Sequence, residues 1–274
     1  MSIINKLHDC IKWYPWLCRV TEAILSGEIN SRLPIQKDNG KELSIILNGP
    51  SLNMSLKYLD PNNTDIMMVN HAIELELYEK LKPLYVCFAD PNLFVPSKNN
   101  YKLYKRIAEI NKKTILFYPS TNKNVIMIKG REMNIRSVFA TEQIVGMDAY
   151  SPKLLEQNLI SPYFINVGIM ALYVGIQLGY KRIVLYGADL SMFKALSVNE
   201  KLEIEQGSTH FYNDQKLNLT RIFRRGYDMT YEMRTWYETF SQFKLLSKYA
   251  EHENVKILNM SKESMLDCFE KCSG

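Results

Sequence analysis

Short apolar runs alternate with helical patterns from residue 43 to the end of the chain. Several of the runs are apolar without interruption, which is typical of parallel strands covered on both faces. Strand following helix in this order predicts an α/β fold, with a Rossmann-like, mostly parallel sheet flanked by helices. The predicted strands cover residues 43–47, 65–70, 84–89, 114–118, 125–128, 182–186 and 255–259. The predicted helices cover residues 72–81, 97–111, 168–179 and 229–252.

Three stretches differ from this alternating pattern. Residues 1–27 read as a helix broken near Pro15, and residues 28–42 are polar with Pro and Gly, so residues 1–42 are expected to form a helical arm and linker. The arm either packs on the main domain or lies at a membrane interface, because Trp and Tyr stand beside Lys and Arg in it. Residues 43–274 then form the α/β domain, and residues 191–227, with weak periodicity, are expected to form a lid.

Composition excludes several classes of protein. With 34 Lys+Arg against 29 Asp+Glu and 46% hydrophobic residues, the chain is neither disordered nor fibrous. A net charge of +5 suits nucleotides or a lipid surface, but it is too small for a nucleic-acid groove. Five scattered cysteines argue against a disulfide framework, and no signal peptide or membrane-spanning run is visible. We therefore expect a cytoplasmic protein, with the inner face of the membrane as a second possibility.

The first predicted strand ends in Asn48, Gly49, Pro50 and Ser51. A glycine lets the backbone turn sharply and approach a ligand closely. Ser51 is a candidate helix N-cap, where free amides form an anion site. The segment is neither GxGxxG nor a Walker loop, so dinucleotide and P-loop readings fail. An ordinary strand-to-helix turn remains the alternative.

Polar residues follow four of the predicted strands: Asn48, Asn70, Asp90 and Asp189. Because ligands bind beyond the carboxyl ends of parallel strands, we expect these residues to meet in one pocket, with His71 as a further candidate. Asp189 is suited to ligate a metal, to act as a base or to brace the loop that follows. No Asp-x-Asp pair occurs in the chain, which favours a metal-independent enzyme without a metal site or cofactor.

The predicted lid contains His210 in an aromatic, polar segment. An imidazole with a pKa near neutrality is suited to deprotonate an acceptor hydroxyl. Tyr212 or Tyr227 is suited to donate a hydrogen bond to a leaving phosphate. The basic side chains of the lid either face solvent or clamp a phosphate or carboxylate; these are Lys216, Arg221, Arg224 and Arg225. The aromatic side chains of helix 229–252 are expected to be mostly core.

Four segments together resemble the bacterial sialyltransferases of glycosyltransferase family 42. Residues 48–52 (NGPSL) are similar to the family's nucleotide-binding turn, and residues 168–189 are similar to its central helix–strand unit with a Gly-x-Asp ending. Residues 208–212 (STHFY) resemble the segment that carries the family's general-base histidine, and residues 88–94 resemble its Asn-Pro loop. The resemblance covers about residues 43–215 by motif order.

The resemblance implies a CMP-activated nonulosonic (sialic-acid-like) donor, inversion at the anomeric carbon and no metal. It implies His210 as the base and a donor-binding turn at Asn166 and Gly168. The candidate nucleotide-binding residues are Asn48, Gly49, Pro50, Ser51, Asn70, Asp90, Asn166, Gly168 and Asp189. Three positions depart from the family: Asp90 replaces an Asn, Asn166-Val167 replace Thr-Ser, and Ser191 stands where a Tyr is expected.

The sequence thus predicts an inverting, metal-independent glycosyltransferase that adds a sugar to a bacterial surface glycan such as lipopolysaccharide or capsule. Its expected partners are a nucleotide sugar and a glycan or glycolipid, with no nucleic acid, and with peripheral membrane association and a homo-oligomer as further possibilities. One alternative is a Mg²⁺-dependent pterin or nucleotide diphosphokinase-like enzyme, since the GPSL and GxD motifs also occur in that domain. The others are a glycosyltransferase for another activated sugar and a non-catalytic binding module.

Overall fold

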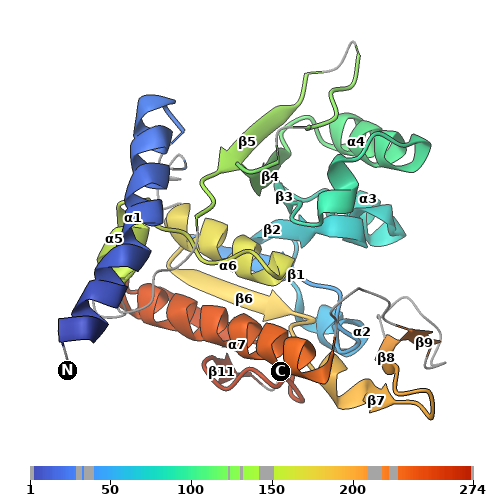
Figure 1. The fold of residues 1–274 in the computed structure, drawn as a ribbon. Helices are drawn as coiled ribbons and strands as arrows, with labels where there is room; N and C mark the ends of the chain where they lie inside the picture. The colour runs from blue at the N-terminus through green and yellow to red at the C-terminus, as the bar shows by residue number, and fades with distance from the viewer. Residues whose placement is uncertain are drawn as a thin grey trace.

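The structure is a computed structural model that describes residues 3–28, 33, 40–122, 124–129, 132–141, 151–208, 218–221 and 228–272. Its centre is an eight-stranded sheet in the order β11-β10-β6-β1-β2-β3-β4-β5 (Figure 1). Every neighbouring pair of strands in this sheet is parallel. The strands are β1 Glu42–Ile46, β2 Thr64–Val69, β3 Tyr85–Cys87, β4 Ile115–Pro119, β5 Asn134–Val138, β6 Arg182–Tyr186, β10 Lys256–Asn259 and β11 Glu270–Lys271.

Helices cover both faces of this sheet, as the sequence predicts. They are α1 Ile3–Leu25, α2 Leu52–Ser55, α3 Glu76–Leu81, α4 Lys98–Ile110, α5 Ser151–Glu156, α6 Val167–Gln177 and α7 Met229–His252. Short 3₁₀ turns occupy Leu56–Tyr58, Asn70–Glu74, Pro91–Phe94 and Met192–Ala195. A second, antiparallel sheet has the order β7-β8-β9, with β7 Leu196–Val198, β8 Ile204–Ser208 and β9 Asn218–Arg221.

Alternate residues of the central strands enter two separate hydrophobic cores. Ile45 of β1 packs with α6 and α7 on one face, whereas Ile46 packs with α2, α3 and α4 on the other. This alternation follows from the two-residue period of a strand. Both kinds of position are apolar, so the strands read as continuous apolar runs in the sequence.

The chain reverses its direction of travel across the sheet at one place. From β1 it proceeds outward through β2, β3, β4 and β5, and then returns to the other side of β1 as β6. Ile45 of β1 is therefore paired with Met67 of β2 on one side and Leu185 of β6 on the other. In open α/β sheets such a switch point leaves a crevice at the carboxyl ends of the two strands.

Several predicted elements are corrected by the structure. Residues 125–128 are not a strand, and Ile128 instead fills the second core from an irregular segment. The fifth strand is β5, in which exposed and half-buried residues alternate, as suits the edge of a sheet. Its few apolar residues gave no strand signal in the sequence. Residues 191–227, for which weak periodicity predicted a loop or lid, include the strands β7, β8 and β9 in their described part.

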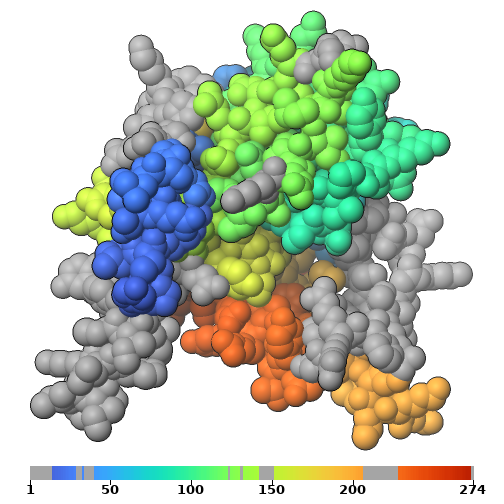
Figure 2. Space-filling model, turned by 45° about the horizontal axis from the view of Figure 1, so that its top comes forward, coloured from blue at the N-terminus to red at the C-terminus, as the bar shows by residue number. Residues whose placement is uncertain are grey.

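The predicted break at Pro15 is also wrong, because α1 continues through it. A proline removes one main-chain donor but does not stop a helix that packing supports. Here the Trp16 indole donates to the carbonyl of Leu159 at 3.1 Å, and Val20 and Ala23 are buried. Helix α1 thus packs on the domain, and its part drawn in blue in Figure 2 lies on the outer surface. No helix in the described ranges is long and apolar enough to cross a bilayer.

Helix α6 approaches the sheet closely through two glycines seven residues apart. A Cβ at Gly175 would lie 2.8 Å from Leu43 Cδ2 and 3.1 Å from Ile183 Cδ1. A Cβ at Gly168 would lie 3.3 Å from Leu47 Cδ1. The absence of these side chains lets the helix lie directly over β1 and β6, which fixes its N-terminus at the switch point (Figure 1).

We predict that Gly175→Ala lowers the free energy of unfolding by about 1–3 kcal/mol, because the added methyl group overpacks the contact with Leu43. Helix propensity alone would favour alanine by about 1 kcal/mol, so the sign of the change tests the contact. Urea denaturation measures it. A Leu43→Val background should reduce the loss, whereas a more stable Gly175→Ala protein would contradict the close approach.

Candidate functional site

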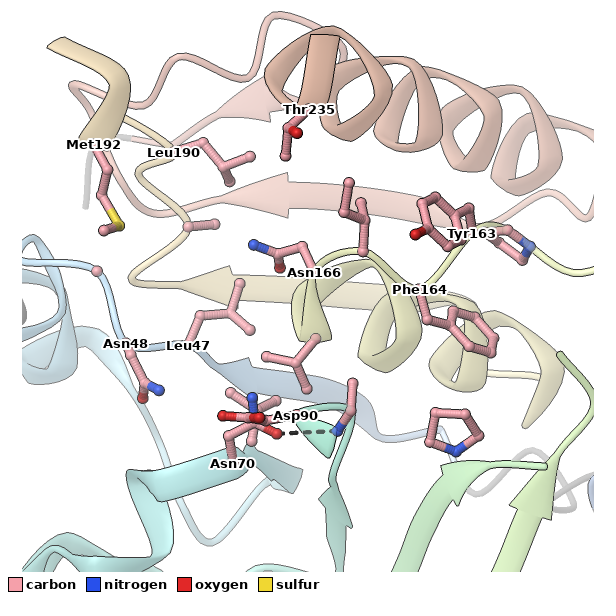
Figure 3. A pocket seen from close by; sticks show the side chains of 18 of the residues that line it. Leu47, Asn48, Asn70, Asp90, Tyr163, Phe164, Asn166, Leu190, Met192 and Thr235 are labelled. Carbon is pink, nitrogen blue, oxygen red and sulfur yellow. Dashed lines mark hydrogen bonds between the residues drawn. The ribbon is translucent and has the colours of Figure 1, made fainter. Parts of the chain in front are cut away.

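A cavity of about 900 Å³ lies at the switch point of the sheet. The segments that follow β1, β2, β3, β4 and β6 line it, together with the N-terminus of α6 and one face of α7 (Figure 3). The four predicted polar strand endings all contribute lining residues, which confirms that they converge; they are Asn48, Asn70, Asp90 and Asp189. His71 is not among the lining residues, and its Nδ1 instead contacts Glu74.

Two glycine-containing turns interlock at the floor of this cavity. The Gly49 amide donates to the Gly187 carbonyl at 3.0 Å. A Cβ on Gly49 would overlap that carbonyl and the Asp189 carboxylate. Gly187 has a positive φ of 69°, and its own Cβ would lie 2.7 Å from the Leu47 carbonyl oxygen. Gly49 was expected to let the backbone approach a ligand closely. In the structure the close approach is instead to the second turn of the protein, at Gly187.

Asp189 braces this pair of turns. Its side chain is buried, and its Oδ2 accepts a hydrogen bond from the Ser51 amide at 2.9 Å. Its carbonyl accepts from the Met265 amide. Of the three roles open to Asp189 from the sequence, the geometry favours the brace, because the carboxylate already holds the turn that carries Asn48.

Ser51 stands at the N-cap position of α2, as expected, but its amide and that of Leu52 are already bonded within the protein and are not left for an anion. Ser51 has helical backbone angles (φ −67°, ψ −11°) and its side chain makes no capping bond. Its amide is bonded to Asp189, and its hydroxyl lies 2.6 Å from the Ser261 hydroxyl. Helix α2, which follows, is only four residues long.

The loop after β10 supports the same floor, although the sequence did not predict it. Ser264 Oγ donates to the Ala188 carbonyl at 2.6 Å, and Asn259 Nδ2 donates to it at 3.3 Å. The signal that could have revealed this loop is the polar ending of the strand at Asn259 and Ser261, which has the same form as the four endings that were used.

Asn48 carries the unsatisfied group of the site. Its Oδ1 is buried and has no hydrogen-bond partner among the described residues, although the side chain lines the cavity (Figure 3). A buried carbonyl without a partner costs about 1–3 kcal/mol. A buried polar atom without a partner calls for an explanation, and a donor supplied from the cavity is one.

Asn70 and Asp90 stand next to one another at the ends of β2 and β3 (Figure 3). Asn70 adopts a left-handed conformation with φ 42°, and its Oδ1 accepts from the Ala89 amide at 3.0 Å. Asp90 Oδ1 accepts from the Asn92 amide at 2.9 Å and caps the 3₁₀ turn that Pro91 begins. Both side chains are thus fixed by local bonds while they line the cavity.

The N-terminus of α6 opens into the cavity. Asn166 is its N-cap and accepts from the Gly168 amide at 2.7 Å. Asn166 and Val167 both line the cavity. The Ile169 amide also bonds to Asn166, through its carbonyl at 3.1 Å, so the Val167 amide and the helix dipole are what make this end favourable for an anion.

The wall opposite the strand endings is aromatic and was assigned mainly to the core from sequence. Phe243 and Tyr249 of α7 are buried, as predicted, but Tyr231, Thr235 and Trp236 line the cavity. Sequence periodicity gave no sign of this, because cavity-lining and core positions share one face of a helix. Further apolar lining comes from Tyr163, Phe164, Leu190 and Met192.

Charge in the described part of the cavity is limited to carboxylates. Asp90 and Asp189 line it, and none of the described lining residues is Lys, Arg or His. The predicted base His210 and the residues Tyr212, Lys216, Arg224, Arg225 and Tyr227 lie outside the described residues. Arg221 ends β9, and only its backbone is described.

The strongest pKa shifts lie away from this cavity. Burial raises the pKa of Tyr85 to about 12, and burial together with the hydrogen bond to Asp65 raises the pKa of Tyr180. The Tyr180 hydroxyl donates to Asp65 Oδ2 at 2.6 Å. Asp65 and Tyr85 lie near the amino ends of β2 and β3, opposite the cavity, so these shifts accompany core packing.

No family model and no curated protein matches the sequence. Among solved structures, the chain is similar to the sialyltransferase CstII from Campylobacter jejuni in complex with cytidine-5'-monophosphate, at 17% identity, a TM-score of 0.47 and 87% coverage of each chain. It is similar to the α-2,3-sialyltransferase Cst-I from Campylobacter jejuni at 19% identity and a TM-score of 0.44, over 87% of this chain and 82% of that one.

A third similarity is to the MAf glycosyltransferase from Magnetospirillum magneticum AMB-1, at 11% identity and a TM-score of 0.47. The alignment covers 85% of this chain but 33% of that one, so the chain spans about a third of that protein's length. All three similarities concern the course of the fold at low identity.

We predict that Gly49→Ala destabilises the protein by more than about 3 kcal/mol, since its methyl group has no space beside Gly187 and Asp189. The matched control is Met54→Ala on α2, because Met54 is 68% exposed. That control should change the free energy of unfolding by less than about 0.5 kcal/mol. Equal stability of the two variants in urea denaturation would show that the turns do not interlock.

Proposed function

We propose that the protein is a glycosyltransferase that binds a nucleotide-activated sugar in the switch-point cavity. More specifically, we propose inverting, metal-independent transfer of a nonulosonic sugar from a CMP donor to a glycan hydroxyl. The observation that carries the proposal is the buried Oδ1 of Asn48, which has no partner among the described residues, in a cavity at the carboxyl ends of parallel strands.

The wall formed by the strand endings suits a nucleoside. Asn48 offers an acceptor, and Asp90 offers carboxylate oxygens to the same cavity. A nucleoside supplies the complementary donors, namely the exocyclic amino group of a base such as cytosine and the hydroxyls of ribose. This wall consists of asparagine side chains and one carboxylate, with no described Lys, Arg or His. It therefore suits the nucleoside, which is the uncharged part of a nucleotide.

The phosphate belongs at the N-terminus of α6. The Val167 amide, at the first position of the helix, is the donor that we assign there, and the helix dipole stabilises negative charge. The basic residues of the predicted lid are candidates for a second set of contacts to the phosphate or to a sugar carboxylate; they are Arg221, Arg224 and Arg225. Asp90 then lies on the nucleoside side, where its charge does not oppose the phosphate directly.

The proposed mechanism gives the proton transfer to His210 and a supporting hydrogen bond to Tyr212, both in the predicted lid. The acceptor hydroxyl oxygen forms a bond to the anomeric carbon while the bond from that carbon to the phosphate oxygen breaks, which inverts the configuration. The acceptor proton passes to the imidazole of His210, and the bonding electrons leave with the nucleotide phosphate. A hydrogen bond from Tyr212 and the N-terminus of α6 stabilise the negative charge on that leaving group.

The sequence leaves a Mg²⁺-dependent diphosphokinase as the competing enzyme class. It requires a metal site at Asp90 and Asp189. The hydrogen bond from the Ser51 amide to Asp189 and the capping role of Asp90 give both carboxylates structural work instead. Retention of activity in EDTA distinguishes the proposed transferase from that enzyme.

The proposal is tested by thermal denaturation in the presence of CMP, UDP, GDP or ADP. A ligand at 100 times its Kd adds about 2.7 kcal/mol to stability. We expect stabilisation by CMP. Asn48→Leu should weaken CMP binding about ten- to a hundredfold and leave the ligand-free protein as stable or more stable, because it removes a buried unpaired acceptor.

The control for this substitution is Asn99→Leu, which changes an exposed asparagine on α4 outside the cavity. CMP binding should not change in that variant. Selective stabilisation by UDP or GDP would contradict the CMP donor. Unchanged CMP binding in Asn48→Leu would show that Asn48 does not contact the nucleotide.

We also predict that His210→Ala lowers transfer by at least about 100-fold while CMP binding is retained, because the variant loses only the proton acceptor. Release of CMP from CMP-N-acetylneuraminic acid measures the rate. His252→Ala, at a partly exposed histidine of α7, is the control and should keep full activity. Wild-type rates in His210→Ala would eliminate this histidine as the base.

A further inference from the structure

We propose that Tyr231 and Trp236 of α7 form a carbohydrate subsite, in which a pyranose ring packs its apolar face against the aromatic side chains. The inference rests on the proposed function and names where the sugar lies in the same cavity. It concerns a wall that is formed by α7 and not by the strand endings.

The α7 wall lies on the side of the cavity opposite the strand endings. Thr235 and Trp236 lie about one helical turn after Tyr231 on α7, and all three line the cavity. Thr235 points from α7 toward the cavity, whereas Asn48 and Asn70 enter it from the far side, with Asn166 between them (Figure 3). A nucleoside on the amide side and a phosphate at Asn166 leave the α7 side for the sugar.

The cavity is large enough for both a nucleotide and a sugar ring. Drug-sized ligands occupy pockets of about 300–1,000 Å³. At about 900 Å³, this cavity lies near the upper end of that range. It therefore has room for a sugar ring in addition to a nucleotide.

Trp236 is held in a fixed orientation. Its indole Nε1 donates to Glu232 Oε1 at 2.7 Å, and its ring packs 5.5 Å from that of Phe193 and 6.2 Å from that of Phe240. Glu232 is only 4% exposed. Burying a carboxylate is costly unless it is bonded, and here the bond fixes an indole at the edge of the cavity. A preorganised ring binds a ligand with less loss of entropy.

The chemistry of this wall matches a pyranose. One face of the ring presents C–H groups, which gain dispersion contacts and bury apolar area against an aromatic face. The hydroxyls around the edge need polar partners, and Thr235, Ser191 and Asn166 line the cavity nearby. A flat nucleobase could also stack on an indole, and the experiment separates these two occupants.

The bound ring belongs either to the donor or to the acceptor, and two kinds of probe distinguish these sources. Free lactose and methyl β-galactopyranoside represent an acceptor. CMP-3-fluoro-N-acetylneuraminic acid, compared with CMP, represents the donor. Binding of each probe to the wild-type protein and its variants is measured by isothermal titration calorimetry.

We expect Trp236→Ala to lower the affinity for at least one sugar-bearing probe about three- to tenfold, while the affinity for CMP stays within about twofold of wild type. Trp236→Phe keeps a ring and should retain part of the affinity. Tyr231→Ala, at a side chain that is 49% exposed, should act in the same direction without a risk to folding. The matched control is Tyr237→Ala, since Tyr237 is 72% exposed and does not line the cavity.

Two results overturn the subsite. Equal loss of CMP affinity in Trp236→Ala would mean that the base, not the sugar, stacks on the indole. The proposed carbohydrate subsite would also be contradicted if the sugar-bearing probes bound equally well without Trp236 and Tyr231. The same holds if free saccharides did not bind the wild-type protein and the CMP-sugar bound no more tightly than CMP. Failure of the proposed function is read separately, as failure of CMP to bind, and the free saccharides then still decide the subsite.

Discussion

The interlock of two turns at the switch point is the contact on which the rest of the site depends. Gly49 and Gly187 approach so closely that neither tolerates a Cβ, and the buried Asp189 carboxylate holds the Ser51 amide across the same junction. These contacts fix the direction in which the chain leaves β1 and β6. They also fix Asn48, whose carbonyl oxygen is buried without a described partner. A rigid floor of this kind allows a polar side chain to remain unpaired until a ligand arrives.

Helix α6 connects this floor to the rest of the fold. Its glycines let it lie directly over β1 and β6, so its N-terminus opens beside the same cavity. The cavity thus has three chemically different parts: amides and a carboxylate at the strand endings, a helix N-terminus, and aromatic rings on α7. Nucleoside, phosphate and sugar follow one another in this order in a nucleotide sugar. The correspondence supports the proposed transferase more strongly than any one residue does.

The parts of the fold with continuous or strongly periodic apolar patterns were predictable from sequence. The predicted segments 182–186 and 229–252 coincide with β6 and α7, because one is an uninterrupted buried run and the other a long amphipathic helix capped by Asp228. β5 was missed because an edge strand needs few apolar residues. The convergence of Asn48, Asn70, Asp90 and Asp189 was predictable, since parallel strands end at one edge. The bracing role of Asp189 and the aromatic wall were not, because both depend on contacts between segments far apart in the chain.

The central claim is that the switch-point cavity binds a nucleotide through Asn48. A crystal structure of the protein with CMP tests it most directly. The account predicts cytidine against the strand endings, with a donor of the ligand within hydrogen-bond distance of Asn48 Oδ1 and the phosphate at the N-terminus of α6. CMP bound elsewhere, or bound in the cavity with Asn48 Oδ1 still unpaired, would contradict it.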